Sequence, residues 1–268
     1  MKPFMLFLAL FSFAGLKAQT TKPANKDVTA YDYKDMFLVN QWVLKNPDSE
    51  VRKFTKSFTR YGETFYYLPR EFWQDTASNK EIKEFIRNKF LIFVWPYAIW
   101  FEQYSGISRL LPITMAARET AWGTSERYAR SGGELFSIKQ KKFQRELGFS
   151  DGFCYRDDKH HDTFVQLWFG HNQTTLYSFQ LYLLSITQDH YTERLPNKGA
   201  ALKSRVAKWR NWEFDQTYTL KYSAQEYLDC LCGHESFNWA TNCEGYEKSF
   251  KVVEKRINDL KSKKLIKP

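Results

Sequence analysis

The sequence predicts a mainly α-helical protein with one small β or loop excursion. Apolar residues recur at helical spacing in three stretches, around residues 82–100, 108–123 and 252–260. Between the second and third stretches, residues 148–163 are polar and rich in charge, which favours a hairpin or loop over a helix. Hydrophobic residues make up 43% of the 268-residue chain, which is enough to build a packed core. This composition excludes a wholly disordered chain and a fibrous repeat.

The N-terminal part predicts an exported protein. A basic start at Lys2 is followed by a 13-residue apolar run, Phe4–Leu16, and by a small residue, Ala18, after which cleavage is expected. A membrane-spanning helix needs about 20 apolar residues, so we interpret residues 1–18 as a cleavable signal peptide and a membrane anchor as the alternative. The mature chain is then expected to be secreted or periplasmic, without stable membrane insertion.

Residues 19–78 predict a flexible lead-in followed by an accessory helical region. The first twelve of these residues are polar and lack periodicity. Residues 65–68, just before Pro69, are typical of a short extended segment. Near-helical spacing of apolar residues comes before it, at Phe37, Val39, Trp42 and Val43.

Two helices are predicted next. The first begins near residue 79 and leads into the apolar run 90–101, which contains Pro96 and is too short to span a membrane. The second follows Gly106, and Gly123 is placed to end it. Its start is marked by Ser108, a candidate N-cap, and by Pro112 in or near the first turn.

The remaining chain predicts two more helices. Residues 164–186 are largely helical in pattern. The C-terminal helix has a lysine-rich face and an apolar stripe at Val252, Val253, Ile257 and Leu260. Residues 261–268 are expected to form a basic tail.

The four cysteines predict at least one disulfide in an oxidising compartment. The chain carries Cys154, Cys230, Cys232 and Cys243. A bridge from Cys230 or Cys232 to Cys243 would close one loop. The alternative is a zinc site built from the last three cysteines and His234, but this spacing is not a common zinc pattern, so we expect no metal.

Glu119 is the candidate general acid. If the second helix continues through this position, Glu119 lies beside Met115 and Trp122. An apolar setting penalises the charged form of a carboxyl, which suits a proton donor at neutral pH; the glutamate beside a tryptophan in lysozyme is an established example. The alternative is a surface glutamate that pairs with Arg118 or Arg127.

Several segments around Glu119 resemble the bacterial glucosaminidases, the autolysin and flagellar-type peptidoglycan hydrolases. The resemblance covers roughly residues 79–260, which we expect to form the catalytic domain. It is carried by Gly106-Ile107-Ser108, by Ala116-Ala117-x-Glu119-x-x-Trp122-Gly123-x-Ser125, by Leu135-Phe136-x-Ile138-Lys139, and by Trp239-Ala240-Thr241-Asn242 through Tyr246.

The resemblance implies a lysozyme-like α+β fold with a small β-lobe beside the cleft, and Glu119 as the catalytic acid. It also implies a second carboxylate from the β-lobe, for which Asp157 and Asp158 are the candidates and Asp162 is the third. The residues expected to line the glycan groove are Trp122, Tyr128, Phe136, Trp239 and Tyr246; core packing is the alternative for each.

Two departures from the family pattern bear on activity. Gly133-Glu134 replaces an Asn-Asn pair, and Trp239 replaces a tyrosine. A tryptophan can stack on a sugar but has no hydroxyl to donate.

The expected function is therefore cleavage of N-acetylglucosaminyl bonds in peptidoglycan by an endo-acting enzyme, without a cofactor and as a monomer. Retaining, inverting and substrate-assisted routes all remain open. The alternatives are a muramidase or lytic transglycosylase of similar fold, and a non-catalytic wall-binding module. The net charge of +10 suits acidic polymers, but export argues against a nucleic-acid partner.

Overall fold

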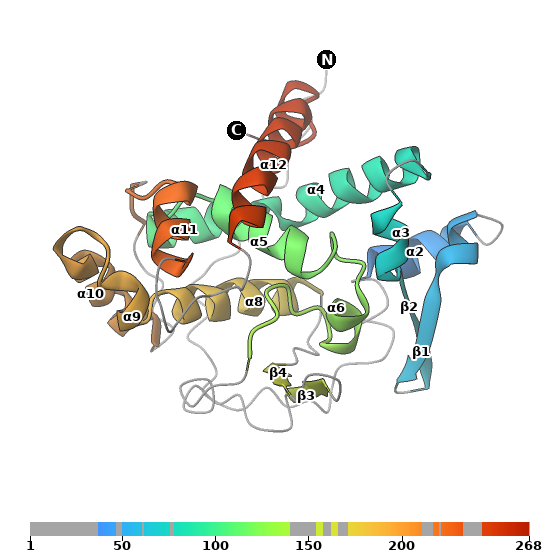
Figure 1. Ribbon diagram of the computed structural model, residues 1–268, viewed down its shortest axis with the longest axis horizontal. Helices are drawn as coiled ribbons and strands as arrows, with labels where there is room; N and C mark the ends of the chain where they lie inside the picture. Colours follow the sequence, from blue (N-terminus) through green and yellow to red (C-terminus); the bar gives the residue numbers. More distant parts are fainter. Residues whose placement is uncertain are drawn as a thin grey trace, which may run out of the picture.

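The computed structural model describes residues 37–267 apart from 47–49, 61, 76–77, 140–153, 158–161, 166–170, 211–216, 220 and 233–242. The described part is mostly helical and contains two small antiparallel hairpins (Figure 1). The predicted mainly α class with a small β element is confirmed. The predicted signal peptide lies outside the described residues.

The elements follow one another along the chain with short connections. They are α2 (Leu38–Lys45), the 3-10 helix η2 (Glu50–Phe54), β1 (Lys56–Arg60), β2 (Glu63–Tyr67), α3 (Arg70–Gln74), α4 (Lys80–Ser105), α5 (Leu110–Glu119), α6 (Glu126–Arg130), β3 (Cys154–Asp157), β4 (Asp162–Val165), α8 (His171–Ile186), α9 (Asp189–Thr192), the 3-10 helix η4 (Pro196–Gly199), α10 (Ala200–Arg210), α11 (Ala224–Cys232) and α12 (Glu244–Ser262).

The first described elements combine helices with a hairpin. Strands β1 and β2 pair in register from Lys56 opposite Tyr67 to Arg60 opposite Glu63. The predicted extended segment before Pro69 is confirmed as β2, but the predicted accessory region is only partly helical. Phe37 and Phe65 are buried in the same hydrophobic cluster as α4 and α5, so this region packs directly on the main core.

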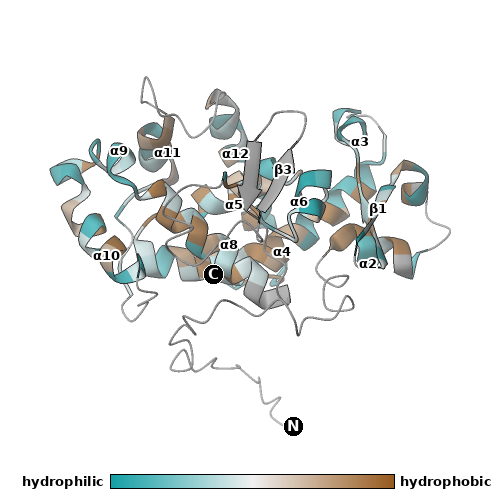
Figure 2. Cartoon of the chain, turned by 90° about the horizontal axis from the view of Figure 1, so that it is seen from below, coloured by the Kyte–Doolittle hydropathy of each residue, from teal (hydrophilic) through white to brown (hydrophobic). Residues whose placement is uncertain are grey.

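Helices α4 and α8 form the centre of the core. The predicted run through residues 82–101 is confirmed as one 26-residue helix, α4, with Pro96 on its exposed side. Nearly every side chain of α8 from Thr174 onward is buried, and α8 packs against α4. Figure 2 shows the hydrophobic residues gathered where α4, α5 and α8 meet. A helix buried on all sides needs no polar face.

The prediction that a helix begins at residue 164 was wrong. Phe164 belongs to β4, which pairs with β3 from Cys154 opposite Val165 to Asp157 opposite Asp162. Pairing with β3 gives the backbone amides and carbonyls of this segment the partners that a helix would otherwise supply. The predicted hairpin within residues 148–163 is thereby confirmed, and α8 starts only at His171.

Helix α12 confirms the predicted C-terminal helix. Its stripe is buried at Val253, Ile257 and Leu260, whereas Val252 is 50% exposed. The predicted basic tail is not free of the core, because Ile266 is buried and Trp95 Nε1 on α4 donates to the Lys267 carbonyl at 2.9 Å. None of the described helices is both long enough and apolar enough to cross a membrane.

Gly106 fixes where α5 begins. It ends α4 with φ of 72°, a conformation that favours glycine. A Cβ atom here would lie 2.9 Å from the Thr219 carbonyl oxygen, because the segment through Tyr222 runs alongside. Lys221 N donates to the Gly106 carbonyl at 2.7 Å, and Ser108 N donates to the Tyr222 carbonyl at 2.9 Å. Both the turn and the close approach therefore require glycine.

Candidate active site

Glu119 is the last residue of α5, and its side chain is half-buried. The helix presents a buried face that includes Ile113, Met115 and Ala116, and it packs against α4, α11 and α12. Burial of this face fixes the position of α5, so the carboxyl group at its end is held in place from behind.

A left-handed turn follows Glu119 directly. Ala121, Trp122 and Gly123 have φ of 47°, 60° and 72°. Thr120 holds the turn, since its Oγ1 donates to the Ala116 carbonyl at 2.6 Å and accepts from Gly123 N at 2.8 Å. The prediction that the helix runs on to Gly123 was therefore wrong, because α5 ends four residues earlier.

Trp122 consequently does not lie on the same helix as Glu119. Its ring packs edge-to-face on Phe90 of α4, with centroids 5.9 Å apart, and the Arg87 guanidinium lies 5.8 Å from its centroid. The side chain is half-buried. The helical spacing that placed Trp122 beside Glu119 fails because the left-handed turn redirects the chain toward α4.

We expect Ala121→Gly to stabilise the protein by roughly 0.5–1 kcal/mol. A non-glycine residue with positive φ is strained, and glycine adopts the same backbone at lower cost. Urea unfolding of the two proteins measures the change. The matched control is Gly123→Ala, which should destabilise because φ is 72° and the added Cβ would lie 3.0 Å from Phe90 Cδ2. A lower midpoint for Ala121→Gly would contradict this interpretation of the turn.

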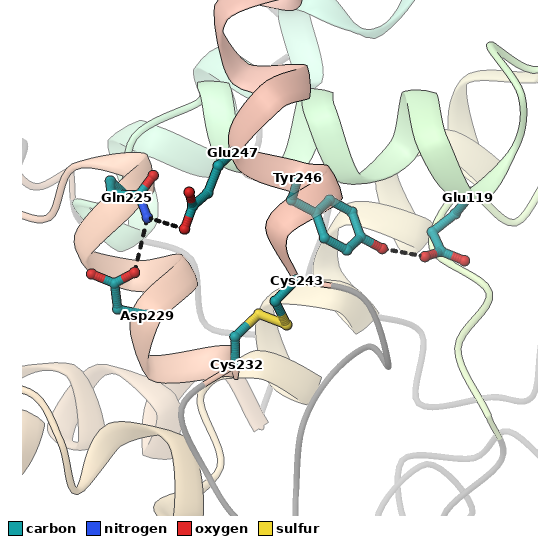
Figure 3. The surroundings of a disulfide bond; sticks show 7 residues. All are labelled: Glu119, Gln225, Asp229, Cys232, Cys243, Tyr246 and Glu247. Carbon is teal, nitrogen blue, oxygen red and sulfur yellow. Dashed lines mark hydrogen bonds between the residues drawn. A yellow bond between two sulfur atoms is a disulfide. The ribbon is translucent and has the colours of Figure 1, made fainter.

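The Glu119 carboxyl group accepts a hydrogen bond from a buried tyrosine. Tyr246 Oη on α12 donates to Glu119 Oε1 at 2.5 Å (Figure 3). Tyr246 is only 3% exposed, and burial together with the negative charge of Glu119 raises the pKa of its hydroxyl. The hydroxyl therefore keeps its proton and acts as a fixed donor that orients the carboxyl group.

Arg118 supports Tyr246 instead of pairing with Glu119. Its guanidinium lies 4.5 Å from the centroid of the Tyr246 ring, and its Nη1 donates to the Gly245 carbonyl and to Ser249 Oγ, the latter at 3.0 Å. A Cβ atom on Gly245 would lie 2.5 Å from Arg118 Nη2, so glycine makes room for this contact. The predicted alternative, a surface ion pair between Glu119 and Arg118, is not what the structure shows.

A disulfide fixes the start of α12. It joins Cys232, at the end of α11, to Cys243, three residues before Tyr246 (Figure 3). One of the two predicted bridges is thus confirmed, and the zinc alternative is wrong because two of its ligands are bonded to each other. Cys230 is a buried free thiol, and His234 lies outside the described residues.

Glu134 is a second carboxyl group near Glu119. It is 2% exposed and accepts hydrogen bonds from Phe136 N at 2.7 Å, Ile138 N at 3.0 Å and Ser178 Oγ at 3.2 Å. Burial raises the pKa of Glu134 to about 7 against the three hydrogen bonds, and the negative charge of Glu119 adds to the rise. Sequence reasoning did not select this residue, although a lone carboxylate inside an apolar run could have pointed to it.

The Glu134 pKa predicts a definite pH dependence of stability. Between about 4.5, its ordinary value, and about 7, the carboxyl is ionised in the unfolded chain but protonated in the folded one. Folding then takes up a proton, so raising the pH across this range lowers the free energy of unfolding.

We expect the stability of Glu134→Gln relative to wild type to rise by about 3 kcal/mol between these two pH values, because the variant lacks this titration. Urea unfolding at both ends of the range checks it. A difference between the two proteins that does not change with pH would contradict a raised pKa at Glu134.

The other predicted site residues have different fates. Tyr128 and Phe136 are buried in the hydrophobic core, and Phe136 stacks on Tyr182 with centroids 4.1 Å apart. Packing on both sides leaves them no face for a substrate, so they support the site from behind. Asp157 and Asp162 are register partners in the β3–β4 hairpin. Asp158 and Trp239 lie outside the described residues.

Within the described ranges, no group of three or more His, Cys, Asp or Glu side chains is arranged to hold a metal ion. Comparison of the chain with protein-family models, with curated proteins and with solved structures gave no match. The resemblance to the glucosaminidases therefore rests on the motifs and on the way the fold arranges them.

Proposed function

We propose that this protein is a secreted peptidoglycan hydrolase of lysozyme-like fold, an endo-β-N-acetylglucosaminidase with Glu119 as its general acid. The observation that carries the proposal is the hydrogen bond between Glu119 and Tyr246, which are 127 residues apart in the chain. They belong to two separate segments of the glucosaminidase resemblance, and the contact joins those segments at one carboxyl group.

The chemistry needs a proton for the leaving oxygen and stabilisation of an oxocarbenium-like centre. Glu119 supplies the proton, oriented by the Tyr246 hydroxyl. Glu134 is too enclosed to reach a sugar, and its negative charge instead affects Glu119 through space. The second carboxylate is proposed to come from the hairpin, where Asp157 is the first described candidate; Asp158 is its neighbour in sequence, and the substrate's own N-acetyl group is the alternative.

Location and partner follow from the same proposal. The interpretation of residues 1–18 as a signal peptide places the mature chain outside the cytoplasm, and the Cys232–Cys243 disulfide is compatible with an oxidising compartment. The positive net charge favours encounter with a wall polymer whose peptide stems carry carboxylates.

Digestion of purified peptidoglycan tests the proposal. The purified protein is expected to release new reducing ends in proportion to time and enzyme concentration. Co-sedimentation with cell walls without release of any reducing end would favour the non-catalytic wall-binding module instead.

Tyr246→Phe is expected to lower kcat for glycan cleavage about tenfold or more, since hydrogen bonds to charged groups contribute about 1.5–3 kcal/mol. The variant loses the donor to Glu119 but keeps the ring on which Arg118 stacks. Steady-state kinetics on soluble glycan strands measures kcat and KM separately. Tyr222→Phe, on another partly buried tyrosine, is the control and should keep full activity. An unchanged kcat in Tyr246→Phe would show that the hydroxyl does not orient the acid.

A further inference from the structure

A pocket of about 300 Å³ lies between α5, α12 and Trp122. Helices α5 and α12 run side by side (Figure 1) and pack against each other. Two lining residues, Arg118 and Gly245, are the direct chain neighbours of Glu119 and Tyr246. A ligand in this pocket would therefore lie next to the candidate acid.

The walls of the pocket are mainly apolar. Ala117 on α5 faces Val252 and Val253 on α12, and Trp122 closes one end. Such walls suit methyl-sized groups but give few partners to the hydroxyl groups of a sugar ring. The volume is at the small end of the range for ligand pockets, roughly 300–1,000 Å³. A short aliphatic chain fits these properties better than a saccharide.

One buried hydroxyl in the lining has no partner. Thr114 is fully buried, and within the described part of the chain its Oγ1 makes no hydrogen bond. By contrast, Ser249 Oγ accepts from Arg118 and donates to the Gly245 carbonyl at 2.8 Å. An unpartnered buried hydroxyl is unfavourable. A ligand with a peptide carbonyl or amide would satisfy Thr114.

The charged groups of the lining are both positive. Arg118 is held in position by its contacts with Gly245 and Ser249, and Lys248 is exposed on the next turn of α12. No lining residue is acidic. A fixed guanidinium and a nearby ammonium group together favour a single anionic group, and a carboxylate matches their geometry.

We propose that this pocket binds the C-terminal end of a short alanine-containing peptide with a free carboxylate. The methyl groups contact Ala117 and Val253, the carboxylate lies between Arg118 and Lys248, and Thr114 bonds a peptide group. Resting on the proposed function, the pocket is a subsite for the peptide stem of peptidoglycan. The enzyme would thereby read the peptide as well as the glycan strand.

Binding to the full chain tests this inference without turnover. The probe is a synthetic stem tetrapeptide ending in D-alanine, compared with its C-terminal carboxamide by isothermal titration calorimetry on Glu119→Gln. The free acid is expected to bind about tenfold tighter than the amide. Adding Lys248→Gln should remove that difference, and adding Thr114→Val should weaken binding of both forms about fivefold. Lys251→Gln, on an exposed position of α12 outside the pocket, is the control.

Equal binding of acid and amide, or binding of neither, would overturn the inference. Cleavage assays separate it from the proposed function. Lys248→Gln is expected to raise KM for peptide-bearing glycan but not for glycan stripped of its peptides. A wild-type chain that binds the acid and cuts neither glycan would sink the proposed function and leave the subsite standing. One that cuts both but binds no peptide would do the reverse.

Discussion

Replacement of Glu119 by glutamine is expected to lower kcat for glycan cleavage about a thousandfold, within the range that general acid catalysis contributes. Glutamine keeps the shape of the side chain and its Oε1 can still accept from Tyr246, so the end of α5 should remain in place. Only the transferable proton is lost. Initial rates of reducing-end release on soluble glycan strands measure the change.

The matched control is Glu126→Gln. Glu126 lies seven residues further along the chain, on α6, where it pairs with Arg130 at 2.7 Å on the surface. Loss of a surface ion pair changes stability by about 0–1 kcal/mol and should leave kcat unchanged. Equal rates for wild type, Glu119→Gln and Glu126→Gln would remove Glu119 from the mechanism.

Removal of the disulfide is expected to produce the largest loss of stability. The bridge closes a loop with a sequence separation of 11, for which the chain-entropy estimate is about 3 kcal/mol. For a chain of this size, a loss of that size lowers Tm by roughly 6–12 °C. Cys232→Ser/Cys243→Ser in a thermal scan checks the prediction.

Activity should fall together with stability in that double variant. Cys243 comes directly before α12, and Tyr246 on the first turn of α12 orients Glu119. Gln225 would still link α11 to α12, since its Nε2 donates to Asp229 and to Glu247, so the helices should separate only partly (Figure 3). Cys230→Ala leaves the bridge intact and is the control. A double variant with unchanged Tm would mean that the bridge constrains nothing in the unfolded chain.

The main helices could be predicted from the sequence because their signals are local. Ile82 and Ile86 mark the start of α4, and Gly106 ends it by its freedom to adopt positive φ. The end of α5 could not be predicted in the same way. Ala121 and Trp122 adopt left-handed backbone only because Thr120 and the packing of Trp122 on Phe90 hold them there.

The candidate site was predictable only where one segment carried the signal. Glu119 was found from its own surroundings in the sequence. Glu134 was not, because its burial and raised pKa depend on Ser178, 44 residues away, and on the charge of Glu119. Phe136 was expected in the groove because aromatic residues suit both sugars and cores, and only its stacking on Tyr182 decides between them.

The masses of the products test the central claim most directly. Peptidoglycan digested by the wild-type protein is reduced with borohydride, and the fragments are analysed by mass spectrometry. The account predicts fragments that end in reduced N-acetylglucosamine, and none from Glu119→Gln. Fragments that end in reduced or anhydro-muramic acid would identify a muramidase or a lytic transglycosylase, and an undigested wall at every pH tested would contradict catalysis altogether.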